Sequence, residues 1–296
     1  MKITVKTLME LAVIVHKHCG IVLKKNKAYL IENRLQPLIE EYSLSSFEEL
    51  IAKAKDSSQL TSHIVDLMTT NETSFFRDKK PYELLKEKLL PDWQANFGKK
   101  RGRLNIWSSA CSTGQEVYSI AITLMEYFKG DNHNIKIKAS DVSDSAIVKA
   151  SSGRYSNYEI SRGLDAVQLN QYFTKEGSCW KIKDELRSMV YFEKMNLLQP
   201  KLEFGRFDII FCRNVAIYFS KPDRRRLFES LSSCLNDSGV LIIGATESLF
   251  DINEQLKRVD YNGTVYYSLK QPFHWNQSNI EDTLAISCSG STGFTR

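Results

Sequence analysis

The sequence of 296 residues contains no long hydrophobic run. A membrane-spanning helix needs about 20 consecutive apolar residues, and no stretch comes close to that length. The six cysteines are scattered without a C-x-x-C pair, which argues against a zinc site and against a disulfide framework. They are Cys19, Cys111, Cys179, Cys212, Cys234 and Cys288. We therefore expect a protein of the reducing cytoplasm that is not embedded in a membrane and holds no metal.

The N-terminus lacks the features of a secretion signal. Lys2 and Lys6 precede a short apolar run at 11–15, but Glu10 and His16 bracket that run, and no small-residue cleavage site follows. We therefore expect no export.

The composition is that of an ordinary globular protein. Hydrophobic residues make up 42% of the chain and charged residues 25%, so the chain can bury a sizeable core. The net charge of +5 is mildly basic. This charge permits an acidic partner but does not require that partner to be nucleic acid, and we expect no binding of nucleic acid.

Residues 1–70 predict an all-helical N-terminal domain. Apolar residues repeat there at helical spacing. They form three stripes: Ile31, Leu35, Leu38, Ile39 and Tyr42; Phe47, Leu50, Ile51 and Ala54; and Leu60, Ile64, Leu67 and Met68. Ser46, with Glu49 three residues later, predicts a capping box.

The same region carries a cluster of positive charge, made of Lys17, Lys24, Lys25, Lys27 and Arg34 with His16 and His18 nearby. One interpretation is a solvated helix face. The other is a docking face for an acidic helix or a nucleic-acid backbone, although Tyr29 is the main aromatic residue available for base stacking.

Residues 71–100 form a linker that we expect to contribute to a ligand site. Its start, 71–78, holds two adjacent phenylalanines, which suggests packing between two domains, while Asn71, Thr73 and Arg77 can reach a ligand. A helix is expected at Pro81–Trp93, with the proline in its first turn.

Residues 101–270 alternate strand and helix, which indicates an α/β domain with a mostly parallel sheet. The expected strands are Leu104–Ser109, Ile135–Ser140, Val190–Lys194, Phe207–Arg213, Val240–Ala245 and a hairpin of 258–261 with 264–269 around Asn262-Gly263. The expected helices are Gln115–Phe128, Ser143–Ala150 and Pro222–Leu235. Residues 151–189 break the pattern and are interpreted as an insertion with a short helix, 164–173, and substrate contacts or a small antiparallel hairpin. Residues 271–296 are expected to be a flexible tail.

The stretch 106–118 is the centre of this domain. An apolar run ends in small residues, and a helical pattern begins after Gly114, which predicts a strand, a tight turn and a helix whose free N–H groups face a ligand. The turn has neither the three glycines of a dinucleotide loop nor the Gly-Lys-Ser/Thr of a phosphate loop. S-adenosylmethionine (SAM), a nucleotide-like ligand without a pyrophosphate, fits better; the alternative is an ordinary βα turn.

Two acidic residues near this turn are candidates for ligand binding. Asp141 closes the second strand, where an acidic residue accepts hydrogen bonds from ribose hydroxyls. The alternative is that Asp141 caps the following helix. Glu116 lies in the first turn after Gly114, where it either complements the helix dipole or faces the ligand.

Polar residues also follow the third and fourth strands, at the edge where ligands of open α/β sheets bind. Asn196 and Leu197 follow the third strand, and Arg213 and Asn214 end the fourth. Tyr218 comes shortly after and either lines the entrance to the site or only packs.

Four blocks in this order resemble the chemotaxis receptor methyltransferases, the CheR family. The blocks are 70–77 (TNETSFFR), 110–116 (ACSTGQE), 211–219 (FCRNVAIYF) and 244–249 (GATESL), and 20–23 and 29–35 resemble the N-terminal helical domain of the family. The resemblance covers residues 1–270 and implies a SAM-dependent methyltransferase fold with a small helical domain.

The resemblance also implies the reaction and its residues. The family transfers the methyl group of SAM to glutamates of chemoreceptor helices, leaving S-adenosylhomocysteine. Tyr218 and Arg77 would act at the reacting groups, and the basic N-terminal helices would meet the receptor. The implied SAM contacts are Asn71, Thr73, Arg77, Glu116, Asp141, Asn196, Leu197, Arg213 and Asn214.

Two positions depart from the family pattern. Ala216 stands where a bulkier aliphatic residue is common, and the segment 174–185 is short compared with members that bind a receptor's C-terminal peptide. We therefore expect no tight binding of such a peptide.

The alternative functions are methylation of RNA or of a small molecule on the same fold, and a non-catalytic SAM-binding signalling module. A monomer is the default.

Overall fold

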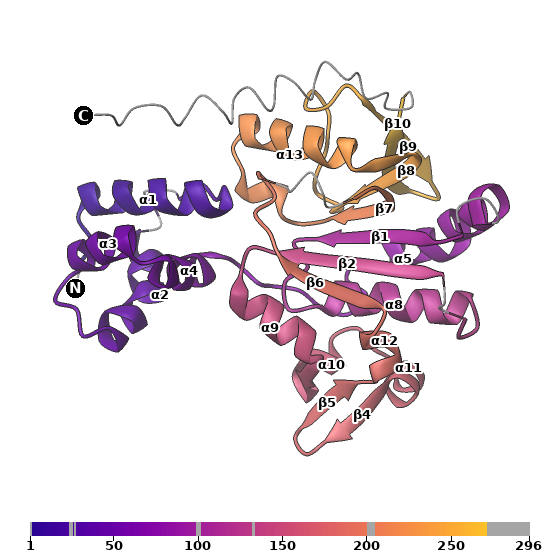
Figure 1. The fold of residues 1–296 in the computed structure, drawn as a ribbon, viewed down its shortest axis with the longest axis horizontal. Helices are drawn as coiled ribbons and strands as arrows, with labels where there is room; N and C mark the ends of the chain where they lie inside the picture. Colours follow the sequence, from indigo (N-terminus) through magenta and orange to yellow (C-terminus); the bar gives the residue numbers. More distant parts are fainter. Residues whose placement is uncertain are drawn as a thin grey trace, which may run out of the picture.

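The computed structural model describes residues 2–23, 26, 28–98, 102–131, 134–199 and 205–270. These residues form a bundle of N-terminal helices, a central sheet with helices on both faces, and a small second sheet beside it (Figure 1). None of the helices within these ranges has both the length and the apolar content that crossing a membrane requires. The tail expected at 271–296 lies outside the described residues.

The N-terminal bundle has a core of its own. Its helices are α1 (Val5–Cys19), α2 (Ala28–Glu41), α3 (Phe47–Asp56) and α4 (Ser58–Met68). The predicted apolar stripes face inward: Leu35, Leu50 and Ile64 are fully buried. Ser46 caps α3 as predicted by accepting the N–H of Glu49, but Glu49 bonds the backbone of Ser45 instead of closing the box on Ser46.

The central sheet is mostly parallel, as the alternation of elements predicts. Its strands are β1 (Leu104–Ser109), β2 (Ile135–Asp141), β6 (Val190–Lys194), β7 (Phe207–Cys212), β8 (Leu235–Ile243), β9 (Leu256–Tyr261) and β10 (Thr264–Leu269). Their order is β6-β2-β1-β7-β8-β10-β9, and only the pairs made by β10 are antiparallel. The carboxyl ends of β1, β2, β6 and β7 therefore meet at one edge, facing the N-terminal bundle (Figure 1).

Helices cover both faces of this sheet. Helix α8 (Gln115–Tyr127) packs on one face, and α13 (Lys221–Ser233) packs on the other. Helix α9 (Asp144–Ser152) follows β2 and contacts both β2 and β6.

Most predicted boundaries agree with the structure within two residues, and two elements differ more. Strand β8 begins at Leu235, not Val240, because Leu235 pairs with Phe207 across a register shift that the polar sequence after Leu235 conceals. The helix expected at Pro81–Trp93 runs from Lys80 to Gly98. Its pieces are α5 (Lys80–Leu84), η2 (Leu85–Leu89), α6 (Leu90–Trp93) and η3 (Gln94–Gly98). The turn before Pro91 is widened, so that the N–H of Leu90 bonds the carbonyl of Leu85 ahead of a residue that has no N–H.

The insertion is larger than a hairpin. A third strand joins the expected pair to give the antiparallel order β3-β5-β4. The elements are β3 (Arg154–Ser156), α10 (Asn157–Ser161), α11 (Ala166–Tyr172), β4 (Phe173–Glu176), β5 (Cys179–Ile182) and α12 (Asp184–Arg187). Strand β3 escaped prediction because three residues are too few to show an alternating pattern.

The insertion packs against the linker. Phe75 is buried and packs edge-on against Tyr155 and Phe173, so it joins the linker to the insertion and not to the N-terminal bundle. Gly163 lies against the same segment with φ of +118°, and a Cβ there would come 1.9 Å from the carbonyl oxygen of Phe75. Only glycine fits this position.

Replacing Gly163 with alanine should therefore loosen the linker. We expect Gly163→Ala to lower the free energy of unfolding by more than about 2 kcal/mol, since a strained φ alone costs roughly 1–3 kcal/mol and the clash adds to it. The matched control is Gly177→Ala, which has φ of +60° but no heavy atom within 4 Å of the new Cβ. Urea unfolding measures both, and equal losses would contradict the close approach to Phe75.

Candidate cofactor and active site

A cavity lies where the N-terminal bundle, the linker and the carboxyl end of the sheet meet. Its space, counted to the solvent at its mouth, is about 850 Å³. The walls combine the end of α1, the segment 69–77 that runs from the end of α4 into the linker, the turns after β1, β2 and β6, and the segment 213–219 after β7. This is the location expected for a ligand site of an open α/β sheet.

The turn after β1 is built from backbone that few residues adopt. Ala110 and Ser112 have φ of 56° and 51°, and Gly114 has φ of 94°. A Cβ on Gly114 would also lie 2.9 Å from both the Cβ of Ala150 and the hydroxyl of Tyr155. Gly114 therefore lets the turn bend tightly and lets α8 begin directly at Gln115, so that Glu116 in its first turn lines the cavity.

Asp141 is the buried carboxylate of the site. It is 6% exposed, and its Oδ2 and Oδ1 accept the backbone N–H groups of Ser112 (2.8 Å) and Ser143 (3.0 Å). Burial raises the pKa of this carboxyl, while the N–H groups of Ser143 and Ser112 act in the opposite direction. The side chain of Ser143, not that of Asp141, caps α9, so the capping alternative for Asp141 is wrong. Each carboxylate oxygen keeps capacity for a ligand donor.

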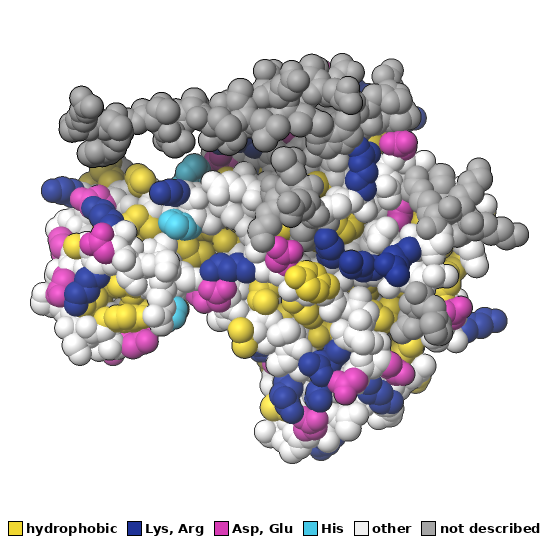
Figure 2. Space-filling model, in the orientation of Figure 1, with side chains coloured by type: hydrophobic (Ala, Val, Ile, Leu, Met, Phe, Trp, Pro, Cys, Tyr) yellow, Lys and Arg dark blue, Asp and Glu magenta, His cyan; other side chains and the backbone are white. Residues whose placement is uncertain are grey.

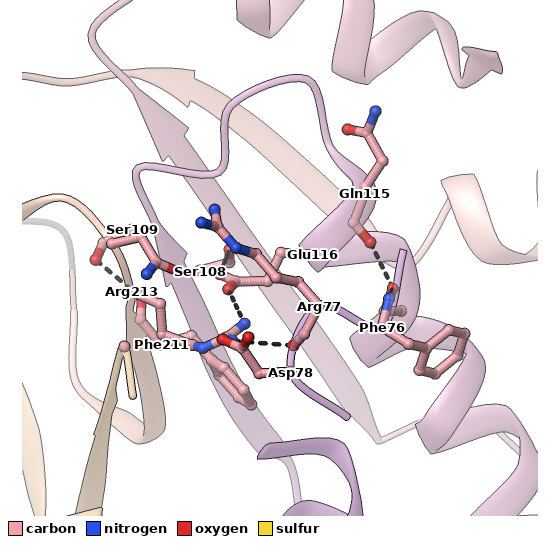
Figure 3. Close-up of polar contacts among 12 residues, drawn as sticks. Phe76, Arg77, Asp78, Ser108, Ser109, Gln115, Glu116, Phe211 and Arg213 are labelled. Carbon is pink, nitrogen blue, oxygen red and sulfur yellow. Dashed lines mark hydrogen bonds and ion pairs between the residues drawn. The ribbon is translucent and has the colours of Figure 1, made fainter. Parts of the chain in front are cut away.

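Arg213 joins the sheet to the linker from inside the protein (Figure 3). Its side chain is 1% exposed, and Nη1 donates to Oε2 of Glu116 at 2.9 Å. Nη2 donates to Oδ2 of Asp78 at 2.7 Å and to the carbonyl of Arg77 at 3.0 Å. Burial works to lower the pKa of Arg213, but Glu116, Tyr82 and Asp78 raise it overall. Ser108 donates to the other oxygen of Glu116.

The linker segment held by Arg213 is strained. Phe76, Asp78 and Lys79 all have positive φ, at 47°, 66° and 46°. Such backbone persists only where surrounding contacts fix it, as the buried guanidinium does here. The result is that Arg77 lines the cavity, with one N–H donated to the carbonyl of Glu72 at 3.0 Å.

The structure brings together nine of the ten residues expected at the site. They are Asn71, Thr73, Arg77, Glu116, Asp141, Leu197, Arg213, Asn214 and Tyr218, and all of them line the cavity. Asn196 does not line it. Its Oδ1 instead accepts the N–H of Leu198 at 3.0 Å, because an Asn side chain readily closes a turn on its own backbone.

Several residues of the wall were not predicted as site residues. Cys19 and Ile21, at the end of α1, line the cavity although they carry no characteristic chemistry. Gly20 between them has φ of +75°, and a Cβ there would come 2.5 Å from Leu198 and 2.7 Å from Phe219. The N-terminal bundle therefore closes directly onto the α/β domain.

The basic N-terminal cluster is only partly free. Arg34 donates to the carbonyls of Leu67, Met68 and Thr69, so it caps the end of α4 ahead of the cavity wall. His16 bonds Asp223 of α13 at 2.8 Å. Arg34 therefore joins α2 to the end of α4, and His16 joins α1 to α13. Lys24, Lys25 and Lys27 lie outside the described residues.

Comparison with known proteins identifies the family. The chain matches the family models described as "CheR methyltransferase, all-alpha domain" over residues 6–69 and "CheR methyltransferase, SAM binding domain" over residues 71–265. Chemotaxis protein methyltransferase 1 of Pseudomonas aeruginosa is 38% identical over 265 residues, which cover 87% of this chain and 96% of the relative.

Two further relatives carry the name chemotaxis protein methyltransferase. The protein of Vibrio parahaemolyticus is 39% identical over 85% of this chain and 92% of its own length. That of Borreliella burgdorferi is 35% identical over 83% of this chain and 89% of its own length. The chain therefore belongs to the CheR methyltransferase family, and the predicted SAM-dependent methyltransferase fold, activity and cofactor are confirmed.

The residues of the cavity suit SAM. Three carboxylates (Glu72, Glu116 and Asp141) and two guanidinium groups (Arg77 and Arg213) line it, which complements a ligand with one excess positive charge. The hydroxyl of Ser112 is buried in the wall and has no hydrogen-bond partner among the described residues. A buried hydroxyl of this kind is expected to bond a ligand.

We expect Asp141→Ala to weaken SAM binding at least tenfold, because hydrogen bonds to a charged acceptor contribute about 1.5–3 kcal/mol each. Calorimetry with SAM measures this affinity, and Asp56→Ala, a change at an exposed aspartate at the end of α3, is the control.

SAM affinity of the unchanged chain should also fall as the pH is lowered through the raised pKa of Asp141, and Asp141→Asn should remove that dependence. Unchanged affinity in both variants would take Asp141 out of the site.

Proposed function

Because the chain belongs to the CheR methyltransferase family, we propose that it methylates glutamate carboxylates on the cytoplasmic helices of chemoreceptors. The products are glutamyl methyl esters, which serve sensory adaptation, and S-adenosylhomocysteine. In this proposal the chain acts in the cytoplasm as a monomer.

The position of Arg77 in the cavity wall is the main support for this proposal. Its guanidinium lines the cavity, and only one of its N–H groups is engaged by the part of the chain that the structure describes. The remaining N–H groups form a planar fork suited to a carboxylate. Arg213 fixes the backbone of Arg77 through its carbonyl, so the fork is presented from a rigid segment.

A carboxylate acceptor suits this chemistry. When bound, SAM supplies a methyl group on a sulfonium, which is a good leaving group. A glutamate side chain has a reference pKa of about 4.3 and is already ionised at neutral pH, so its oxygen attacks the methyl carbon without a general base. The task of the chain is to align the two groups and exclude water, which can contribute up to roughly 7–11 kcal/mol.

Tyr218 is the second residue to which the proposal gives a role in the reaction. It is half-buried in the cavity wall on the short helical turn η5 (Ala216–Tyr218), and its carbonyl accepts the N–H of Val22 from the N-terminal bundle at 3.1 Å. We propose that its ring packs near the methyl group and limits the approach of water.

The N-terminal bundle is the proposed receptor-docking unit. On the face shown in Figure 2, its Lys and Arg side chains lie among Asp and Glu side chains and form no continuous field. Lys53 and Lys55, for example, pair with Glu49 and Glu10. Docking therefore depends on individual cations such as the exposed Lys17 and not on a uniform charge.

Methyl labelling tests the proposed function. The purified chain is mixed with SAM labelled on its methyl group and with membranes that contain the chemoreceptors of its source. We expect label in the receptor band, and we expect mild base to release it as methanol, which identifies a carboxyl methyl ester.

Two other outcomes would contradict the proposal. SAM binding without label in any receptor would favour the non-catalytic module, and RNA or small-molecule acceptors would then be tested next. Label that resists base would mean an acceptor other than a carboxylate.

A further inference from the structure

We propose that Glu247 is a positioning residue of the methyltransferase. It lies outside the cavity wall, and it acts on the reaction through the backbone that carries Asn214 and Tyr218. The inference about Tyr218 rests on the proposed function, whereas the inference about Asn214 concerns the cofactor and does not.

Glu247 joins three pieces of backbone with one carboxylate. Its Oε2 accepts the N–H of Asn214 at 2.8 Å and the N–H of Gly244 at 2.8 Å. Its Oε1 accepts the N–H of Ala216 at 2.9 Å. The carboxylate therefore ties Gly244, which follows β8, to Asn214, the second residue after β7, and to Ala216, the first residue of η5.

The surrounding backbone is shaped around this carboxylate. Asn214 has φ of 58°, a left-handed conformation that an external hydrogen bond helps to hold. A Cβ on Gly244 would lie 2.7 Å from Oε2 of Glu247 and 2.9 Å from the side-chain nitrogen of Asn214. The absence of a side chain at Gly244 leaves the space that the carboxylate uses.

Both groups held by Glu247 belong to the site. Asn214 and Tyr218 line the cavity, and η5 places Tyr218 two residues after Ala216. The N–H of Val22 holds Tyr218 from the N-terminal side. The turn is thus fixed from two sides, and Glu247 supplies the contact from within the α/β domain.

The two carboxylate oxygens serve different parts of the site. A glutamine keeps one oxygen and gains an NH₂ group, which cannot accept from an N–H. With its oxygen at the Oε2 position, Glu247→Gln retains the bonds to Asn214 and Gly244 and loses the bond to Ala216. We therefore expect it to disturb Tyr218 more than Asn214, whereas Glu247→Ala removes both ties.

The experiment compares SAM affinity, turnover and folding in the full chain. For Glu247→Gln we expect kcat on receptor membranes to fall about tenfold or more, with the SAM dissociation constant within about threefold of the unchanged chain. For Glu247→Ala we expect SAM affinity to fall about tenfold as well. Glu254→Gln, the same change at an exposed glutamate nearby, is the control and should alter neither quantity.

A second variant disturbs the contacts of Glu247 and leaves its carboxylate in place. Gly244→Ala pushes a Cβ toward Oε2 of Glu247, and we expect it to lower SAM affinity and kcat together. Thermal unfolding of each variant accompanies both measurements.

Normal turnover and normal SAM affinity in folded Glu247→Gln and Glu247→Ala would overturn the proposal. A collapse of folding in the Glu247 and Gly244 variants alike would also overturn it, because the carboxylate would then only stabilise the fold. If the unchanged chain transfers no methyl group to receptors, the proposed function fails, while the SAM affinity of Glu247→Ala still tests the tie to Asn214.

Discussion

The structure of this methyltransferase depends on one buried guanidinium. Arg213 leaves the end of β7 and bonds Glu116 at the start of α8, together with Asp78 and the carbonyl of Arg77 in the linker. A buried charge of this kind is tolerable when it is paired and hydrogen-bonded, as both η nitrogens of Arg213 are, and removing one partner of such a pair typically costs about 3–5 kcal/mol. In the sequence, Arg213 lies 97 residues from Glu116 and 135 residues from Asp78. Arg213, Glu116 and Arg77 all line the cavity.

Three parts of the chain therefore contribute residues to the wall of the cavity. The sheet supplies the turns with Ser112 and Asp141, the linker supplies Arg77, and the N-terminal bundle supplies Cys19 and Ile21. Contacts outside the cavity hold these parts in place. Ser62 of α4 donates to Asp144 at the start of α9, which follows the turn with Asp141, and the insertion holds the linker through Phe75 and Gly163. The N-terminal bundle, which is the proposed docking unit, therefore also contributes to the wall of the cavity.

Much of this arrangement could be predicted from the sequence, for identifiable physical reasons. The strands 104–109 and 207–212 are largely apolar and buried, and ligands of such sheets bind where those strands end. Cys19 and Ile21 escaped prediction because apolar contacts across domains leave no local pattern. Arg34 was assigned to a charged cluster because its charge is visible in the sequence, whereas its bonds to the end of α4 arise only from tertiary packing. The three bonds of Glu247 were hidden for the same reason.

A crystal structure of the full chain with S-adenosylhomocysteine would test the proposed site most directly. We expect the ligand to occupy the described cavity, with its ribose hydroxyls donating to the carboxylate of Asp141 and its sulfur facing the side of the cavity that holds Arg77 and Tyr218. A ligand bound elsewhere, or one whose ribose lies beyond hydrogen-bond reach of Asp141, would contradict it.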